Sequence, residues 1–131
     1  MFIFYNPNPK RKLVDDCVVR AICKITGKTW IEVYYELTDE GAEVGDLFWQ
    51  NYVWGRYLTK RGFEPFLLPN TCPDCFTIKD FCELYPNGEY ILATGRHAVA
   101  VVDGNYYDTS DSGDEVPMYL WRRKETNHGI Q

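Results

Sequence analysis

The stretch RHAVAVVDGNYYDT, residues 96–109, predicts a β-hairpin and decides how the C-terminal half of the chain folds. Asp103-Gly104 is a strong signal for a two-residue turn between an apolar strand and its return strand. With this turn, Val99 pairs with Asp108. Side chains alternate between the two faces of a strand, so His97 and Asp108 lie diagonally opposite on one face. Their backbones are then about 7 Å apart, within reach of the side chains.

A different turn register and a different aspartate are the two alternatives to this pairing. If the turn moves to Gly104-Asn105, Asp108 pairs with Val101, keeps its face and lies one step farther from His97. Asp103 is six residues from His97, roughly 20 Å along a strand at about 3.3 Å per residue, and its place in the turn explains it. We therefore expect Asp108 to be the partner of His97.

The segment DDCVVRA, residues 15–21, predicts the start of a helix that runs to about Ile25. Asp15 or Asp16 is the expected N-cap. The core stripe of this helix comprises Val18, Ala21, Ile22 and Ile25. Cys17 lies about 90° from the centre of that stripe at 100° per residue, so we expect it where the buried face meets an opening.

Cys17, His97 and Asp108 together have the chemistry of a cysteine-dependent hydrolase. A helix N-terminus and a nearby imidazolium both favour the thiolate, which is the nucleophilic form of a cysteine. A carboxylate orients the imidazole. Taken singly, the cysteine is also typical of a small buried hydrophobic residue and the histidine of a satisfied core residue. The other histidine, His128, lies in a polar tail.

The remaining pattern predicts an α+β fold in which N-terminal helices pack on a C-terminal antiparallel β-sheet. We expect one domain over residues 1–123, followed by a polar tail over 124–131. After the first helix, the expected helices are 29–37, 46–61 and 77–84, and Gly41 and Gly45 mark a loop. The expected strands are 63–68, 90–94, 97–102, 106–109 and 116–121.

Charge and hydropathy argue against nucleic-acid binding and membrane association. The 131 residues carry a net charge of −5, which argues against general binding of nucleic acid. The sequence has no apolar stretch near the roughly 20 residues of a membrane span, so we expect no membrane association.

The five cysteines are an odd number and cannot all pair within the chain. We therefore expect reduced thiols and a cytoplasmic protein.

Cys72 and Cys75 form a CxxC pattern, and Cys82 follows seven residues later. Structural zinc needs four ligands, and only His128 or Cys23 is left to complete the set. A redox CxxC normally begins a helix after a strand, whereas this one lies in a proline-flanked loop. We expect surface or partly buried thiols here, and neither a metal nor another cofactor.

The order of Cys17 at the start of the first helix, His97 at the start of a central strand and Asp108 on the next strand resembles the papain-like cysteine peptidase superfamily. The resemblance covers roughly residues 12–122 and is greatest to small standalone members from bacteria and their phages and to bacteriocin-processing peptidases. It implies a helical layer against an antiparallel sheet, with the site between them, and a peptide or protein substrate. By the same resemblance, Cys17 is the nucleophile, His97 the general base and acid, and Asp108 the group that orients the imidazole.

One position departs from the family pattern. The family usually has a glutamine about six residues before the nucleophile, as an oxyanion donor, and Arg11 occupies that position here. The backbone N–H of Cys17 is one remaining donor, and Asn8 or Asn6 is a candidate for the second. Turn formation at Asn-Pro explains both asparagines equally well. The alternatives are a non-catalytic binding module on this fold and an amidase, acyltransferase or deamidase of the same superfamily.

Overall fold

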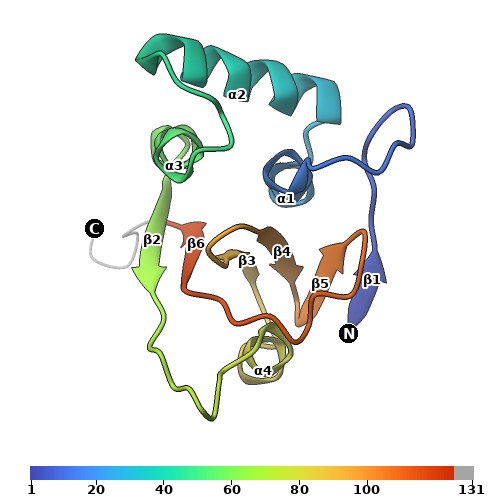
Figure 1. The fold of residues 1–131 in the computed structure, drawn as a ribbon, viewed down its shortest axis with the longest axis vertical. Coiled ribbons are helices and arrows are strands. Elements are labelled where there is room, and N and C mark those ends of the chain that lie inside the picture. Colours follow the sequence, from blue (N-terminus) through green and yellow to red (C-terminus); the bar gives the residue numbers. More distant parts are fainter. Residues whose placement is uncertain (126–131) are drawn as a thin grey trace.

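The computed structural model describes residues 1–125, which form four helices and one six-stranded sheet in an α+β arrangement (Figure 1). In chain order the elements are β1 (Phe2–Phe4), α1 (Cys17–Thr26), α2 (Trp30–Val44), α3 (Asn51–Lys60), β2 (Phe63–Leu67), α4 (Ile78–Leu84), β3 (Glu89–Ala93), β4 (Ala98–Val102), β5 (Asn105–Asp108) and β6 (Tyr119–Arg123). The strands lie in the order β1-β5-β4-β3-β6-β2. The strand β1 pairs in parallel with β5, and the other neighbours are antiparallel.

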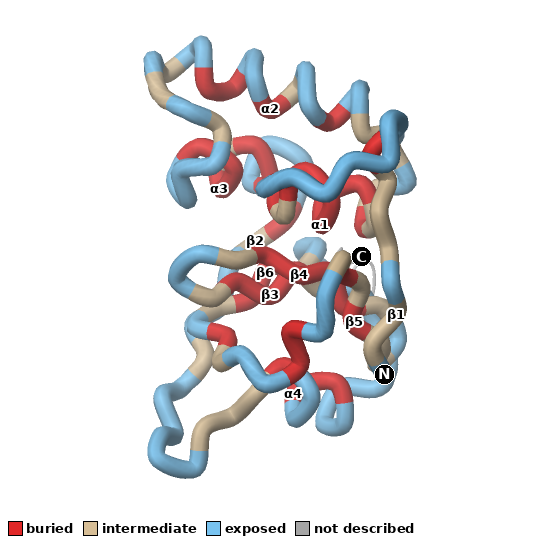
Figure 2. Tube along the Cα trace, turned by 45° about the vertical axis from the view of Figure 1, so that its right-hand side comes forward, coloured by how far each residue is buried: buried red, intermediate tan, exposed pale blue. Residues whose placement is uncertain are grey.

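Helices cover both faces of the sheet. Figure 1 shows α1, α2 and α3 on one face and α4 on the other. Each face has its own apolar cluster. The larger cluster lies between one face of the central strands and the helices α1, α2 and α3. The smaller cluster lies between the opposite face and α4. Buried residues are concentrated on α1 and the central strands (Figure 2). The expected helical layer against an antiparallel sheet is therefore confirmed for β2 to β6, whereas β1 adds a parallel edge strand and α4 adds a layer on the opposite face.

The hairpin of β4 and β5 has the predicted register. Val102 pairs with Asn105 and Val101 with Tyr106, which leaves Asp103 and Gly104 as the turn. Both turn residues have positive φ, 48° and 77°, as a two-residue hairpin turn of this type requires. The predicted side-chain parity of the hairpin therefore holds.

The second helix is longer than its sequence pattern predicts. Thr29 and Glu32 form the expected capping box, but α2 continues through Gly41 to Val44. Gly41 is a packing glycine rather than a loop residue, because a Cβ there would clash with the carbonyl oxygen of Asp46. The N–H of Asp46 donates to the carbonyl of Gly41 at 2.9 Å, which brings the chain back onto the helix.

The third helix begins later than expected, at Asn51 rather than Asp46. The Asp46 carboxylate accepts hydrogen bonds from the Leu47 N–H and the Tyr52 hydroxyl, so residues 46–50 form a turn in front of the helix. The last strand is also shifted, to Tyr119–Arg123, where it pairs with both β3 and β2. The strand β1 was not predicted, because three residues at a sheet edge have too little pattern to identify them.

The expectation that all five cysteines are reduced is wrong for two of them. Cys72 and Cys75 are joined by a disulfide in the loop between β2 and α4. Cys23 and Cys82 are free thiols buried in α1 and α4. His128 and most of the expected polar tail lie outside the described residues, so the zinc alternative that used His128 does too.

Within residues 1–125, none of the helices combines the length and the apolar character that crossing a membrane requires.

Candidate active site

Cys17, His97 and Asp108 come from three separate elements and line one open cavity of about 740 Å³. Cys17 is the first residue of α1, His97 immediately precedes β4, and Asp108 ends β5. The cavity lies where the N-terminus of α1 meets the sheet, and Trp49 and Asn51 extend its wall toward α3. The structure thus brings the three sequence-predicted catalytic residues together.

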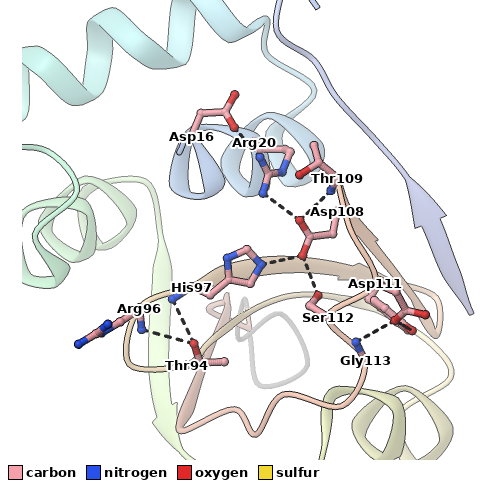
Figure 3. A network of polar contacts seen from close by, with 11 residues as sticks. Asp16, Arg20, Thr94, Arg96, His97, Asp108, Thr109, Asp111, Ser112 and Gly113 are labelled. Carbon is pink, nitrogen blue, oxygen red and sulfur yellow. Dashed lines mark hydrogen bonds and ion pairs between the residues drawn. The ribbon is translucent and has the colours of Figure 1, made fainter. Parts of the chain in front are cut away.

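His97 and Asp108 form a direct ion pair. The Nε2 atom of His97 lies 2.6 Å from Oδ2 of Asp108, and Figure 3 shows the imidazole pointing at that carboxylate. Since Nε2 is occupied, Nδ1 is the ring nitrogen left for the thiol of Cys17. Asp103 lies at the far end of the hairpin, where its carboxylate accepts a hydrogen bond from the N–H of Gly88 at 2.9 Å.

The surroundings of His97 favour its charged form. Burial by itself would lower the pKa of His97, but hydrogen bonds with Asp108 and Cys17 and the negative charges of these groups raise it to about 10. Burial would raise the pKa of Asp108, but its hydrogen bonds with His97 and Ser112 and the charge of His97 lower it to about 2. The pair is therefore an imidazolium and a carboxylate at neutral pH.

The carboxylate of Asp108 is almost fully buried, with 1% of the residue exposed, and every lone-pair direction has a partner. Oδ1 accepts hydrogen bonds from the N–H of Thr109 at 2.7 Å and from Nη2 of Arg20 at 2.9 Å. Oδ2 faces His97 and also accepts from the Ser112 hydroxyl at 2.7 Å. These four donors hold the carboxylate in one orientation (Figure 3).

Arg20 and Asp16 extend this network along α1, and sequence reasoning did not assign them to the site. Asp16 occupies the N-cap position but makes no side-chain cap, because its carboxylate is used elsewhere. Oδ1 of Asp16 pairs with Nη1 of Arg20, and Oδ2 accepts a hydrogen bond from Nε1 of Trp30 at 2.9 Å. The i, i+4 spacing of Asp16 and Arg20 was a readable signal of this ion pair, but Asp108 is 88 residues away from Arg20 in sequence.

The two asparagines expected as oxyanion donors lie in the loop before α1 and do not line the cavity. Oδ1 of Asn6 accepts from the N–H of Asn8 at 3.2 Å, and Oδ1 of Asn8 accepts from the N–H of Lys10 at 2.8 Å. Both side chains thus make the local turns that their Asn-Pro context predicts.

Asn51 is a different asparagine that does line the cavity. It is the first residue of α3, and its Oδ1 lies 3.2 Å from Nε1 of Trp54. An indole N–H can only donate, so the amide oxygen must face Trp54, and the NH₂ group of Asn51 remains as a donor. Nothing in the local sequence identifies this residue, because its place in the cavity wall depends on how α3 packs in the fold.

Of the five cysteines, Cys17 alone is both free and partly exposed. Burial, together with the charges of Asp16 and Glu32, raises the pKa of Cys23 to about 12. Burial also raises the pKa of Cys82. Within residues 1–125, no cluster of three or more histidine, cysteine or acidic side chains is arranged to hold a metal ion.

Comparison of the chain with protein-family models, curated proteins and solved structures found no match.

Proposed function

We propose that this protein is a cysteine-dependent hydrolase, a peptidase with a papain-like arrangement of catalytic residues. The observation that carries the proposal is the convergence of Cys17, His97 and Asp108 in one open cavity, with His97 and Asp108 in contact at 2.6 Å. In this proposal Cys17 is the nucleophile, His97 is the general acid and base, and Asp108 orients the imidazole. The α+β fold, with the site where a helix N-terminus meets a central hairpin, supports the same proposal.

The chemistry starts from a thiolate and an imidazolium. Sγ of Cys17 attacks the carbonyl carbon of the scissile amide, and the carbonyl π electrons move to the oxygen. When this tetrahedral intermediate collapses, a lone pair of the oxyanion re-forms the C=O bond and the C–N bonding pair leaves with nitrogen. The imidazolium of His97 gives its proton to this leaving amine. A thioester and a neutral imidazole remain.

Water then releases the acyl group. The neutral imidazole of His97 takes a proton from a water molecule while the water oxygen attacks the thioester carbonyl carbon. The second tetrahedral intermediate collapses with cleavage of the C–S bond, which frees the acid and restores the thiolate next to the imidazolium. The Asp108 carboxylate keeps its charge throughout and stabilises the imidazolium in both steps.

Two donors are available for the oxyanion. The backbone N–H of Cys17 is unpaired within its helix, because it belongs to the first turn of α1. We assign the second donor to the NH₂ group of Asn51, in place of Asn8 and Asn6, which are engaged in local turns. A pair of such donors stabilises the charge that develops on the carbonyl oxygen.

The test combines labelling with a search for turnover. An electrophilic peptide probe is expected to modify Cys17 in the folded protein, as mapped by mass spectrometry, and His97→Ala is expected to slow the modification. Incubation with a diverse peptide library should give cleavage products with the wild-type protein and none with Cys17→Ser. Modification that is independent of His97, together with no cleavage of the library, would contradict the proposal and favour the non-catalytic binding module.

A further inference from the structure

We propose that Arg20 is a positioning residue that sets both the geometry and the ionisation of the Cys17–His97–Asp108 site; this role rests on the proposed function. Arg20 lies on α1, one turn after Cys17, and only 4% of it is exposed. A buried guanidinium is rare unless its charge is compensated and its donors are used. Two carboxylates supply this compensation here and accept from both terminal nitrogens, Asp16 just before α1 and Asp108 at the end of β5.

The planar guanidinium of Arg20 bridges two elements. Its Nη1 pairs with the carboxylate of Asp16 at the start of α1, and its Nη2 lies 2.9 Å from Oδ1 of Asp108 at the end of β5 (Figure 3). A guanidinium presents its donors in a fixed fork, which suits such a bridge, whereas an ammonium is a point charge on a flexible stem. Arginine at this position is therefore not interchangeable with lysine.

This bridge decides which oxygen of Asp108 faces the histidine. Arg20 and the N–H of Thr109 occupy Oδ1, so Oδ2 is left to accept from His97. Arg20 also belongs to the helix whose first residue is Cys17, so the same contact fixes the nucleophile relative to the hairpin that carries the imidazole. Displacements of about 1 Å in such an arrangement are enough to slow a reaction strongly.

The bridge also balances the charge of the site. The carboxylates of Asp16 and Asp108 are compensated by Arg20 and by the imidazolium of His97, so the buried groups are neutral before the thiolate forms. Without Arg20, a thiolate at Cys17 would form beside an uncompensated buried carboxylate, and the repulsion would oppose it. The other charged groups on the cavity wall, Asp15 and Arg96, are exposed to solvent, which screens them.

A purely structural ion pair would behave differently from a positioning residue. Its loss would lower the free energy of unfolding but would leave the pH dependence of Cys17 reactivity unchanged in the protein that remains folded. The pH profile of Cys17 alkylation therefore separates the two roles, and it needs no knowledge of the substrate.

The experiment measures the rate of Cys17 alkylation by iodoacetamide against pH for the wild type, Arg20→Met and Arg20→Lys. Arg20→Met should move the midpoint of the profile to higher pH by about one unit, which is about a tenfold loss of rate on the acid side. Arg20→Lys keeps the charge but loses the fork, so its shift should have the same direction and be smaller.

Arg56→Met is the matched control. Arg56 also bridges two carboxylates, Glu40 and Glu43, but it does so between α3 and α2 and does not line the cavity. Its removal should leave the alkylation profile at the wild-type midpoint. A shift equal to that of Arg20→Met would show that loss of any such bridge produces the effect, and would overturn the specific role of Arg20.

The outcomes distinguish this role from the proposed function. If His97→Ala changes the pH profile of Cys17 alkylation but the Arg20 variants keep the wild-type profile, the role of Arg20 alone is overturned. A wild-type profile that is insensitive to His97→Ala would overturn the proposed function, and the role of Arg20 with it. If Arg20→Met does not fold, Arg20→Lys decides the question by the presence or absence of its shift.

Discussion

Oδ2 of Asp108 lies 2.6 Å from Nε2 of His97, although the two residues are eleven positions apart in the sequence and a two-residue turn lies between them. The contact is diagonal across the hairpin, so it exists only in a register that keeps both side chains on one face. The geometry of this site thus depends on a local feature of the sequence, the Asp103-Gly104 turn.

The first prediction concerns the choice between two aspartates. Asp108→Ala removes the acceptor of His97 and leaves Nη2 of Arg20 without its carboxylate partner. The rate of peptide hydrolysis should therefore fall by at least about 100-fold, which is in the range of general acid–base contributions. Asp103→Asn should keep nearly full activity, because an amide oxygen can still accept from Gly88 and asparagine tolerates the positive φ of 48°. Rates with a cleaved library peptide provide the measurement, and the reverse order of effects would contradict the assignment.

The second prediction concerns the reactivity of the cysteines under non-reducing conditions. At about pH 6, less than about 1% of an unperturbed thiol is ionised, so ordinary cysteines react slowly with iodoacetamide. Cys23 and Cys82 are buried with raised pKa values, and Cys72 and Cys75 are held in a disulfide. Peptide mapping after limited labelling should therefore find Cys17 modified first.

His97→Ala provides the control for that labelling. It removes the imidazolium that favours the thiolate, so the rate at Cys17 should fall markedly while any labelling of Cys23 and Cys82 stays the same. If Cys82 or Cys23 were modified as fast as Cys17 in the folded protein, a special environment at the start of α1 would be excluded.

Local features were predictable from the sequence. The turn at Asp103-Gly104, the capping box at Thr29 and the start of α1 at Cys17 each depend on a few neighbouring residues, and the structure has all three. The pairing of His97 with Asp108 follows from strand parity once the turn is known.

Features that depend on tertiary packing were not predictable in the same way. The pairing of β1 with β5 joins residues more than 100 positions apart in the sequence, and a strand of three residues has too little pattern to predict it. The pairing of Arg20 with Asp16 is predictable from their i, i+4 spacing, whereas its contact with Asp108 forms only when the hairpin packs against α1. The packing of α3 brings Asn51 into the cavity wall, whereas Asn6 and Asn8, which are nearer to Cys17 in sequence, form turns.

The third prediction concerns the pH dependence of stability. The pKa of His97 is raised from 6.5 to about 10 in the folded protein, so its ion pair contributes fully below pH 6.5, and the contribution is lost as pH rises toward 10. The pKa of Asp108 is lowered from 3.8 to about 2, so its contribution is present above pH 3.8 and is lost as pH falls toward 2. The stabilisation should therefore be largest between about pH 4 and 6.5.

Urea unfolding of the wild type and His97→Gln at several pH values provides the measurement. Glutamine can still donate a hydrogen bond to Asp108 but does not titrate. The difference in free energy of unfolding should be greatest near pH 5 and should shrink steadily from pH 7 to 10. A difference that is constant over this range would show that His97 does not gain a proton affinity on folding.

The fourth prediction concerns Asn51 as the second oxyanion donor. Asn51→Asp keeps an oxygen to accept from Nε1 of Trp54 but replaces the NH₂ group with a second oxygen, so it removes the donor with little change in shape. The loss of one such donor costs about 100- to 1,000-fold in kcat in other acyl-transfer enzymes, and we expect a loss in that range with a smaller change in KM. Alkylation of Cys17 by iodoacetamide has no oxyanion intermediate and serves as the internal control, because a new carboxylate that merely repelled the thiolate would slow alkylation as much as hydrolysis. Equal losses in the two reactions, or an unchanged kcat, would exclude Asn51 as an oxyanion donor.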